Sequence, residues 1–137
     1  MGRVALNTFA AEVAPSRRDL AGPALRAFFN IAGEWGLSVD QERRLLGSPG
    51  RSTYFRWKKY RRGAVPHDVI ERISYILGIY KALHILFPDK AQADGWVKRP
   101  NDGPLFGGRS ALEQMLGGQV ADLYVVRQYL DAQRGWG

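Results

Sequence analysis

The feature that most constrains the fold of this chain is a helical repeat of apolar residues that proline and glycine interrupt. Its longest stretch starts at Pro66 and ends before Pro88, and apolar side chains recur within it every three or four residues. This spacing gathers them on one broad face, which predicts a long core helix. That face carries Val69, Ile70, Ile73, Ile76, Leu77, Tyr80, Leu83 and Phe87.

Start and stop signals predict shorter helices before this core helix. Gly22-Pro23 places proline at a first helical position, and the helix that follows stops at Gly36. The segment 38–41 reads as a capping box that opens a second helix. Ser48-Pro49, a capping residue followed by proline, predicts the start of a third helix that runs to about Arg62.

The same signals continue after the core helix. A turn-rich loop covers residues 98–108, and Ser110 to Glu113 forms a second capping box. The helix that it opens stops at Gly117-Gly118. A final helix places four apolar residues inward, which are Val120, Leu123, Val126 and Leu130. Alternating runs of β-branched residues are absent, so we predict an all-α fold.

Positive charge is concentrated in one predicted helix. The chain carries a formal net charge of +7, and residues 1–65 account for all of this excess. Residues 51–62 contain six basic side chains and no acidic one. With the preceding short helix and the glycine turn at Gly47, this segment is a candidate helix-turn-helix. A basic half of this kind indicates contact with nucleic acid.

A helical wheel separates two sides of the basic helix. Tyr54 and Trp57 share the side that we expect to anchor the helix to the core. They lie about one residue later after Gly47 than in the commonest helix-turn-helix, so we expect a slightly longer turn. The opposite side offers groups that suit phosphates and base edges. The DNA-binding candidates there are Arg51, Ser52, Phe55, Arg56, Lys59 and Arg62.

The composition of the chain argues against several other classes of function. The chain has no cysteine and only two histidines, so we expect no metal site, no cofactor and no thiol chemistry. We expect His84 to be a partly buried side chain bonded to backbone, and His67 to lie at the surface. Charged or polar residues interrupt every apolar run, and Asn7, Thr8 and Glu12 break any signal-peptide core. We therefore expect a cytoplasmic protein with a flexible N-terminal arm at residues 1–16.

The stretch from Trp96 to Trp136 resembles the C-terminal toxin-binding domain of the Xre/MbcA/ParS antitoxin family. The resemblance rests on Trp96, Arg99-Pro100-Asn101, Leu105-Phe106-Gly107-Gly108, Ser110, Leu112, Met115-Leu116, Gly118, Leu123, Val126-Arg127, Tyr129-Leu130-Asp131-Ala132 and Arg134-Gly135-Trp136. Residues 24–58 also resemble the Xre-type helix-turn-helix half of this family. The resemblance implies a helix-turn-helix half at 17–87 and a toxin-binding domain at 88–137, after the arm at 1–16.

Antitoxins of this family neutralise a RES-type toxin that consumes NAD, and they repress their own operon. The resemblance therefore implies a RES-domain toxin and operator DNA as partners, within a homodimer or higher oligomer. Folding alone accounts for about two thirds of the matching residues, since buried and turn positions usually need no functional explanation. The candidates left for toxin contact are Arg99, Arg109, Arg127, Gln128, Asp131, Arg134 and Trp136. We expect Trp136 to act as an interface anchor that helps to block the active site of the toxin.

Two alternatives remain at this point. The chain could be a helix-turn-helix transcriptional regulator with no toxin partner, its second half serving only dimerisation or effector sensing. It could also be an enzyme, with Glu113, Asp122 and Asp131 as the available carboxylates. Each carboxylate has a simpler role as a helix cap, a first-turn acid or an ion-pair partner. No nucleophile and base have the spacing of a catalytic pair. Neither Gly107-Gly108 nor Gly117-Gly118 belongs to a G-x-G-x-x-G motif. We therefore expect no enzymatic activity.

Overall fold

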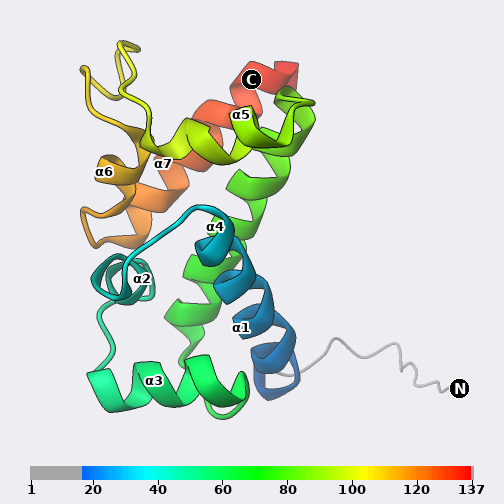
Figure 1. Cartoon of the computed structure of the whole chain (residues 1–137), viewed down its shortest axis with the longest axis vertical. Coiled ribbons are helices and arrows are strands. Elements are labelled where there is room, and N and C mark those ends of the chain that lie inside the picture. The colour runs from blue at the N-terminus through cyan, green and yellow to red at the C-terminus, as the bar shows by residue number, and fades with distance from the viewer. Residues whose placement is uncertain (1–16, 137) are drawn as a thin grey trace, which may run out of the picture.

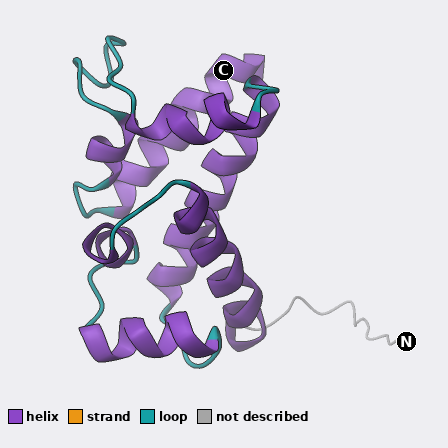
Figure 2. Cartoon of the chain, in the orientation of Figure 1, coloured by secondary structure: helices purple, strands orange, loops and turns teal. Residues whose placement is uncertain are grey.

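The computed structural model describes residues 17–136, and this part of the chain is built from helices and loops alone (Figure 2). The first half contains α1 (Arg17–Glu34), α2 (Val39–Leu45), α3 (Arg51–Tyr60) and α4 (His67–Leu86). The second half contains α5 (Lys90–Gly95), the 3₁₀ turn η1 (Trp96–Lys98), α6 (Ala111–Met115), α7 (Val120–Asp131) and the π-helical η2 (Ala132–Trp136). The predicted all-α fold is confirmed. The predicted arm at 1–16 lies outside the described residues.

The long helix α4 forms the centre of the molecule (Figure 1). It packs most extensively against α1 on one side and α7 on another, and α5 lies across its carboxyl end. Ile73, Ile76 and Leu83 are fully buried in this contact. One apolar core therefore runs through both halves of the chain.

The buried stripe of α4 differs from the predicted one at three positions. Leu77 is 36% exposed, whereas Ile79 and Ala82, which the periodicity did not select, are fully buried. The reason is that α1 and α7 cover different sides of α4, so the buried surface is wider than a single stripe and shifted away from Leu77.

The first helix begins earlier than predicted. Helix α1 starts at Arg17 and carries Pro23 inside it. Ala21, in the segment before the proline, is buried against the core, so extending the helix backward covers apolar surface. Pro23 has no N–H to donate to the preceding turn, so the helix continues through it with one backbone hydrogen bond fewer.

The turn between α2 and α3 corrects a second prediction. Ser48 does not open the third helix, because its φ of 58° is left-handed and its N–H donates to the carbonyl of Arg43 at 2.8 Å. It closes α2 instead, and Gly50 becomes the N-cap of α3. The guanidinium of Arg43 holds the Pro49 carbonyl at 2.9 Å. The turn thus spans residues 46–50, as the late position of the aromatic anchors predicted, and α3 ends at Tyr60 rather than Arg62.

Cationic side chains tie the second half of the chain to the first. Arg44 donates to the Leu116 carbonyl at 2.8 Å, and Arg72 donates to the Gly118 carbonyl at 3.1 Å. Arg72 also lies against Gly47 of the helix-turn-helix turn, where a Cβ atom would stand 3.0 Å from its Nε. The turn between α6 and α7 is therefore fixed directly to the helix-turn-helix.

A buried carboxylate holds α3 against α2. Glu42 is 4% exposed, and its Oε1 accepts hydrogen bonds from the hydroxyl of fully buried Tyr54 and from Lys58 Nζ at 3.1 Å. Burial and the hydrogen bond to Glu42 raise the pKa of Tyr54, so the phenol stays a donor at neutral pH. These contacts confirm Tyr54 as an anchor of α3, and Trp57, which is 2% exposed, is the other.

We predict that Tyr54→Phe lowers the free energy of unfolding by about 1–3 kcal/mol, because it removes a donor from a buried carboxylate. Urea denaturation followed by circular dichroism measures the change. Tyr60→Phe is the matched control, since Tyr60 lies on the same helix and is 53% exposed. Equal stability of the two variants would contradict the assignment.

Candidate functional site

The outer face of α3 collects the predicted nucleic-acid contacts. Arg51, Ser52, Phe55, Arg56 and Lys59 are all exposed, and they lie on the side opposite Tyr54 and Trp57. Arg62 is also exposed, beyond the left-handed residue Arg61 that ends the helix. Helix α3 lies at the end of the molecule away from α5 and the C-terminus (Figure 1). This face is therefore open along its length and carries no acidic residue.

The six basic residues of this segment divide into two groups. Lys58 pairs with buried Glu42 at 3.1 Å. Arg61 donates to the Lys58 carbonyl at 3.2 Å and places its guanidinium 5.3 Å from the ring centre of Phe29. These two cations serve the fold. The four that point outward are Arg51, Arg56, Lys59 and Arg62.

Two exposed aromatic rings lie among these cations. The guanidinium of Arg51 stands 5.3 Å from the ring centre of Phe55, and Phe55 is 43% exposed. Lys59 and Arg62 lie 5.3 Å and 5.8 Å from the ring centre of Tyr60. Arg51 also faces Asp40 at 3.8 Å, an exposed ion pair that contributes little and is easily exchanged for a phosphate.

The toxin-contact candidates fall into two places. Arg99 and Arg109 flank the neck of a loop that an isolated bridge between Pro100 and Ser110 closes. Arg99 donates to the Gln92 carbonyl at 3.0 Å, and Arg109 donates to Gln114 at 2.6 Å. Both residues are exposed, so these contacts hold them at the surface.

The other candidates lie on α7 and η2. Arg127 and Arg134 both approach Asp131, at 3.2 Å and 3.7 Å. The Arg127 guanidinium covers Gly78 of α4 so closely that a Cβ there would overlap it, and the Arg134 side chain is only 16% exposed. Gln128 is exposed and donates to the Tyr124 hydroxyl at 2.7 Å. The Trp136 side chain lies outside the described residues.

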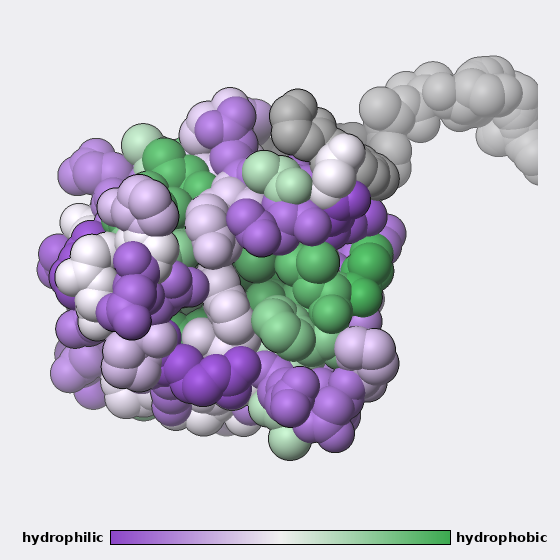
Figure 3. Space-filling view, turned by 90° about the horizontal axis from the view of Figure 1, so that it is seen from above, coloured by the Kyte–Doolittle hydropathy of each residue, from purple (hydrophilic) through white to green (hydrophobic). Residues whose placement is uncertain are grey.

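A small groove beside α7 escaped the sequence reasoning. It has a volume of about 230 Å³ and lies where α4, η1, α7 and η2 meet. Its lining residues are Leu86, Phe87, Trp96, Tyr129, Leu130 and Gln133. Figure 3 looks down on this end of the molecule and shows a patch of apolar side chains among polar ones. Periodicity could not find the groove, because its residues come from four separate elements.

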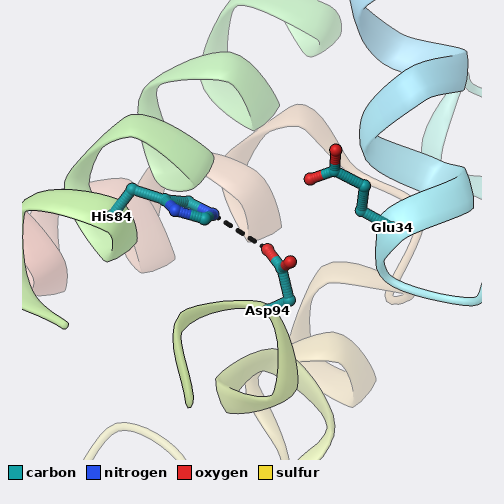
Figure 4. Close-up of side chains that lie close together, drawn as sticks. All are labelled: Glu34, His84 and Asp94. Carbon is teal, nitrogen blue, oxygen red and sulfur yellow. Dashed lines mark hydrogen bonds and ion pairs between the residues drawn. The ribbon is translucent and has the colours of Figure 1, made fainter. Parts of the chain in front are cut away.

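A polar cluster joins α1, α4 and α5 (Figure 4). Glu34, His84 and Asp94 point toward one another, and their ligand atoms all lie within 4.8 Å. His84 Nε2 meets Asp94 at 2.8 Å, which corrects the expectation that this histidine bonds to backbone. Because α5 packs across α4, Asp94 contacts the imidazole of His84, which stands ten residues earlier in the chain.

An ammonium group already bridges the two carboxylates of this cluster. Lys90 Nζ stands 3.1 Å from Glu34 and 2.5 Å from Asp94. Three carboxylate and imidazole ligands can hold a metal ion, but a metal ion here would have to displace Lys90. We therefore assign the cluster a structural role in joining three helices.

The carboxylates of the cluster are held in their charged form. Hydrogen bonds from Tyr80 and Lys90 lower the pKa of Glu34, and the bond to Glu34, with burial, raises the pKa of Tyr80 to about 12. Burial of Asp94 acts to raise its pKa, but the hydrogen bonds from Lys90 and His84 outweigh it and the pKa falls. The bonds to Asp94 and Glu34 in turn raise the pKa of Lys90.

Comparison with known proteins identifies both halves of the chain. Residues 14–78 match the antitoxin Xre-like helix-turn-helix domain, and residues 82–135 match the antitoxin Xre/MbcA/ParS C-terminal toxin-binding domain. The chain belongs to the Xre/MbcA/ParS antitoxin family. The uncharacterized protein y4oB of Sinorhizobium fredii (strain NBRC 101917 / NGR234) is 57% identical over 122 residues, which is 88% of this chain and 92% of that protein.

This family membership assigns a domain type to each half of the chain. The protein is an antitoxin with a helix-turn-helix DNA-binding domain and a toxin-binding domain, as the sequence resemblance implied. The three carboxylates considered for catalysis all have structural partners in the antitoxin. Glu113 and Asp122 complete capping boxes, and Asp131 pairs with Arg127 and Arg134. Within the described residues, no helix is long and apolar enough to cross a membrane.

We predict that Glu34→Gln removes a small, pH-dependent part of the stability. The folded pKa of Glu34 is lowered, so its contribution is complete above its unfolded pKa of about 4.5 and is lost as the pH falls through the lower folded value. The side chain is 38% exposed, so the loss at pH 7 should be about 0.5 kcal/mol or less. Urea denaturation at pH 7, 5 and 3.5 measures it.

In this series, the difference in the free energy of unfolding between Glu34→Gln and wild type should become smaller as the pH falls. Glu71→Gln, which removes the same charge from α4, is the control and should change stability less at pH 7. A constant difference at all three pH values would show that Glu34 acts through packing rather than charge.

Proposed function

We propose that this antitoxin represses its own operon by inserting α3 into the major groove of promoter DNA. The observation that carries the proposal is the outward face of α3, where Arg51, Arg56, Lys59 and Arg62 are exposed without an acidic neighbour on the helix. Guanidinium and ammonium groups supply phosphate contacts, while Ser52 and Arg56 lie near enough to the helix start to meet base edges. Because operators of such proteins usually offer two half-sites, a homodimer or higher oligomer is the proposed binding species.

We further propose that the second half neutralises a RES-type, NAD-consuming toxin by covering the entrance to its active site. The supporting observation is spatial, because the toxin-binding domain and α3 occupy opposite ends of the molecule (Figure 1). Arg99, Arg109 and Gln128 present exposed polar groups, and Trp136 supplies a large aromatic side chain at the end of the chain. The antitoxin itself acts by binding, in the cytoplasm, with no cofactor and no catalytic step.

We predict that the triple variant Arg51→Ala, Arg56→Ala, Lys59→Ala weakens promoter binding at least tenfold. Four outward cations give an expected slope of about −3.6 per protomer for log affinity against log salt concentration, and the variant should reduce its magnitude to about one per protomer. Fluorescence anisotropy at several salt concentrations measures the affinity and its dependence on salt. Arg61→Ala is the matched control and should keep the wild-type slope, since Arg61 is held against Phe29. A wild-type slope near zero would exclude α3 as the electrostatic contact.

We predict that Trp136→Ala weakens toxin binding about thirtyfold or more, because truncated aromatic anchors commonly cost at least 2 kcal/mol. Deletion of residues 135–137 should do the same, and it spares the Arg134–Asp131 pair. Calorimetry with the protein encoded by the neighbouring gene measures the affinity, and NAD consumption by that protein measures neutralisation. The triple α3 variant is the control and should bind toxin normally.

Unchanged affinity and inhibition in both C-terminal variants would exclude Trp136 as an anchor. If co-expression with the genomic neighbour returns only the antitoxin and DNA, the protein is instead a transcriptional regulator without a toxin partner.

A further inference from the structure

One apolar ring interrupts the polar outer face of α3. Phe55 lies in the middle of the helix, one turn after Arg51 and one turn before Lys59, and it is 43% exposed. Its ring packs edge-on against buried Tyr54, with centres 4.9 Å apart. Arg51 also lies over it, with its guanidinium 5.3 Å from the ring centre. These contacts hold the ring in place and leave part of it facing outward.

The chemistry of this ring limits what it can recognise in DNA. A phenylalanine ring neither donates nor accepts a conventional hydrogen bond, so it is unsuited to phosphate oxygens and to most base edges. In the major groove, the C5-methyl group of thymine is the one apolar group that a base edge presents. Tyr60, the other exposed aromatic residue of α3, differs because it has a hydroxyl and stands at the helix end between Lys59 and Arg62.

The position of Phe55 suits such a contact. Recognition helices meet base edges with their N-terminal part, and Phe55 is the fifth residue of α3, on the same face as Arg51 and Ser52. Gly50 is the N-cap of α3, and nothing lies within 4 Å of the place where a Cβ of this residue would stand, so the approach to this end of the helix is open. Because Tyr54 and Arg51 already hold the ring, little side-chain freedom remains to be lost on binding.

We propose that Phe55 is a specificity residue that reads thymine, by packing its ring against the C5-methyl group in the major groove. Arg51 positions the ring and contacts the neighbouring phosphate. This inference rests on the proposed DNA binding by α3. It adds a base preference that phosphate contacts alone do not provide.

Uracil scanning tests the proposal. The wild-type antitoxin first selects its preferred duplex from a random DNA pool, and each thymine of that duplex is then replaced in turn by deoxyuracil, which lacks only the methyl group. At one or two thymines of each half-site, replacement should weaken wild-type binding about three- to fivefold. Phe55→Ala should bind the thymine and uracil duplexes equally, whereas Phe55→Leu should keep part of the difference.

Two controls separate this role from a general loss of binding. Tyr60→Ala removes the other exposed aromatic ring of α3 and should retain the full wild-type sensitivity to uracil. Thermal melting by circular dichroism confirms that each variant is folded.

The outcomes distinguish the inference from the function on which it rests. If the wild type selects and binds a sequence but no uracil replacement changes its affinity, the thymine contact is wrong and DNA binding stands. The same holds if Phe55→Ala keeps the uracil sensitivity of the wild type. If the wild type selects no sequence and shows no salt-dependent DNA binding, the proposed repressor function fails and the thymine contact fails with it.

Discussion

The burial of α4 between α1 and α7 is the constraint on which the rest of the antitoxin depends. Residues such as Ile73, Ile76 and Ile79 have no contact with water, and the helices that cover them belong to both halves of the chain. The helix-turn-helix and the toxin-binding domain therefore share one core instead of two. Apolar burial on this scale is the main favourable contribution to folding, so neither half has its full core without the other.

Polar contacts between helices add to the shared apolar core. Arg44 and Arg72 bind carbonyls of the turn between α6 and α7, and Lys90 joins acids of α1 and α5. Arg72 is mostly buried, and it touches both the turn of the helix-turn-helix and Gly118. The face of α3 that we propose for DNA and the domain that we propose to bind a toxin thus lie at opposite ends of the molecule, so the two proposed partners would not compete for the same space.

The sequence predicted much of this structure where the signal is local. The capping boxes at Ser38 and Ser110, three of the four predicted inward residues of α7 and the anchoring of α3 by its two aromatics all depend on spacing within one element, whereas Val120 is only partly buried. Predictions failed where a partner outside the motif that carried the signal decides. Ser48 carries a start signal, but the Arg43 carbonyl takes its N–H, and His84 pairs with Asp94 because α5 folds back across α4. The small groove beside α7 has no local signal, since four elements build it.

The sequence by itself determined that this chain is helical and that residues 51–62 carry six basic side chains and no acidic one. It also determined that the two halves of the chain resemble the two domains of an antitoxin. Only the tertiary structure decided which of the six cations are available. Lys58 and Arg61 turn toward Glu42 and Phe29, which lie on other helices, while the other four remain outside. A helical wheel gives the direction in which a side chain leaves its helix. Which groups that side chain contacts depends on how the other helices pack around it.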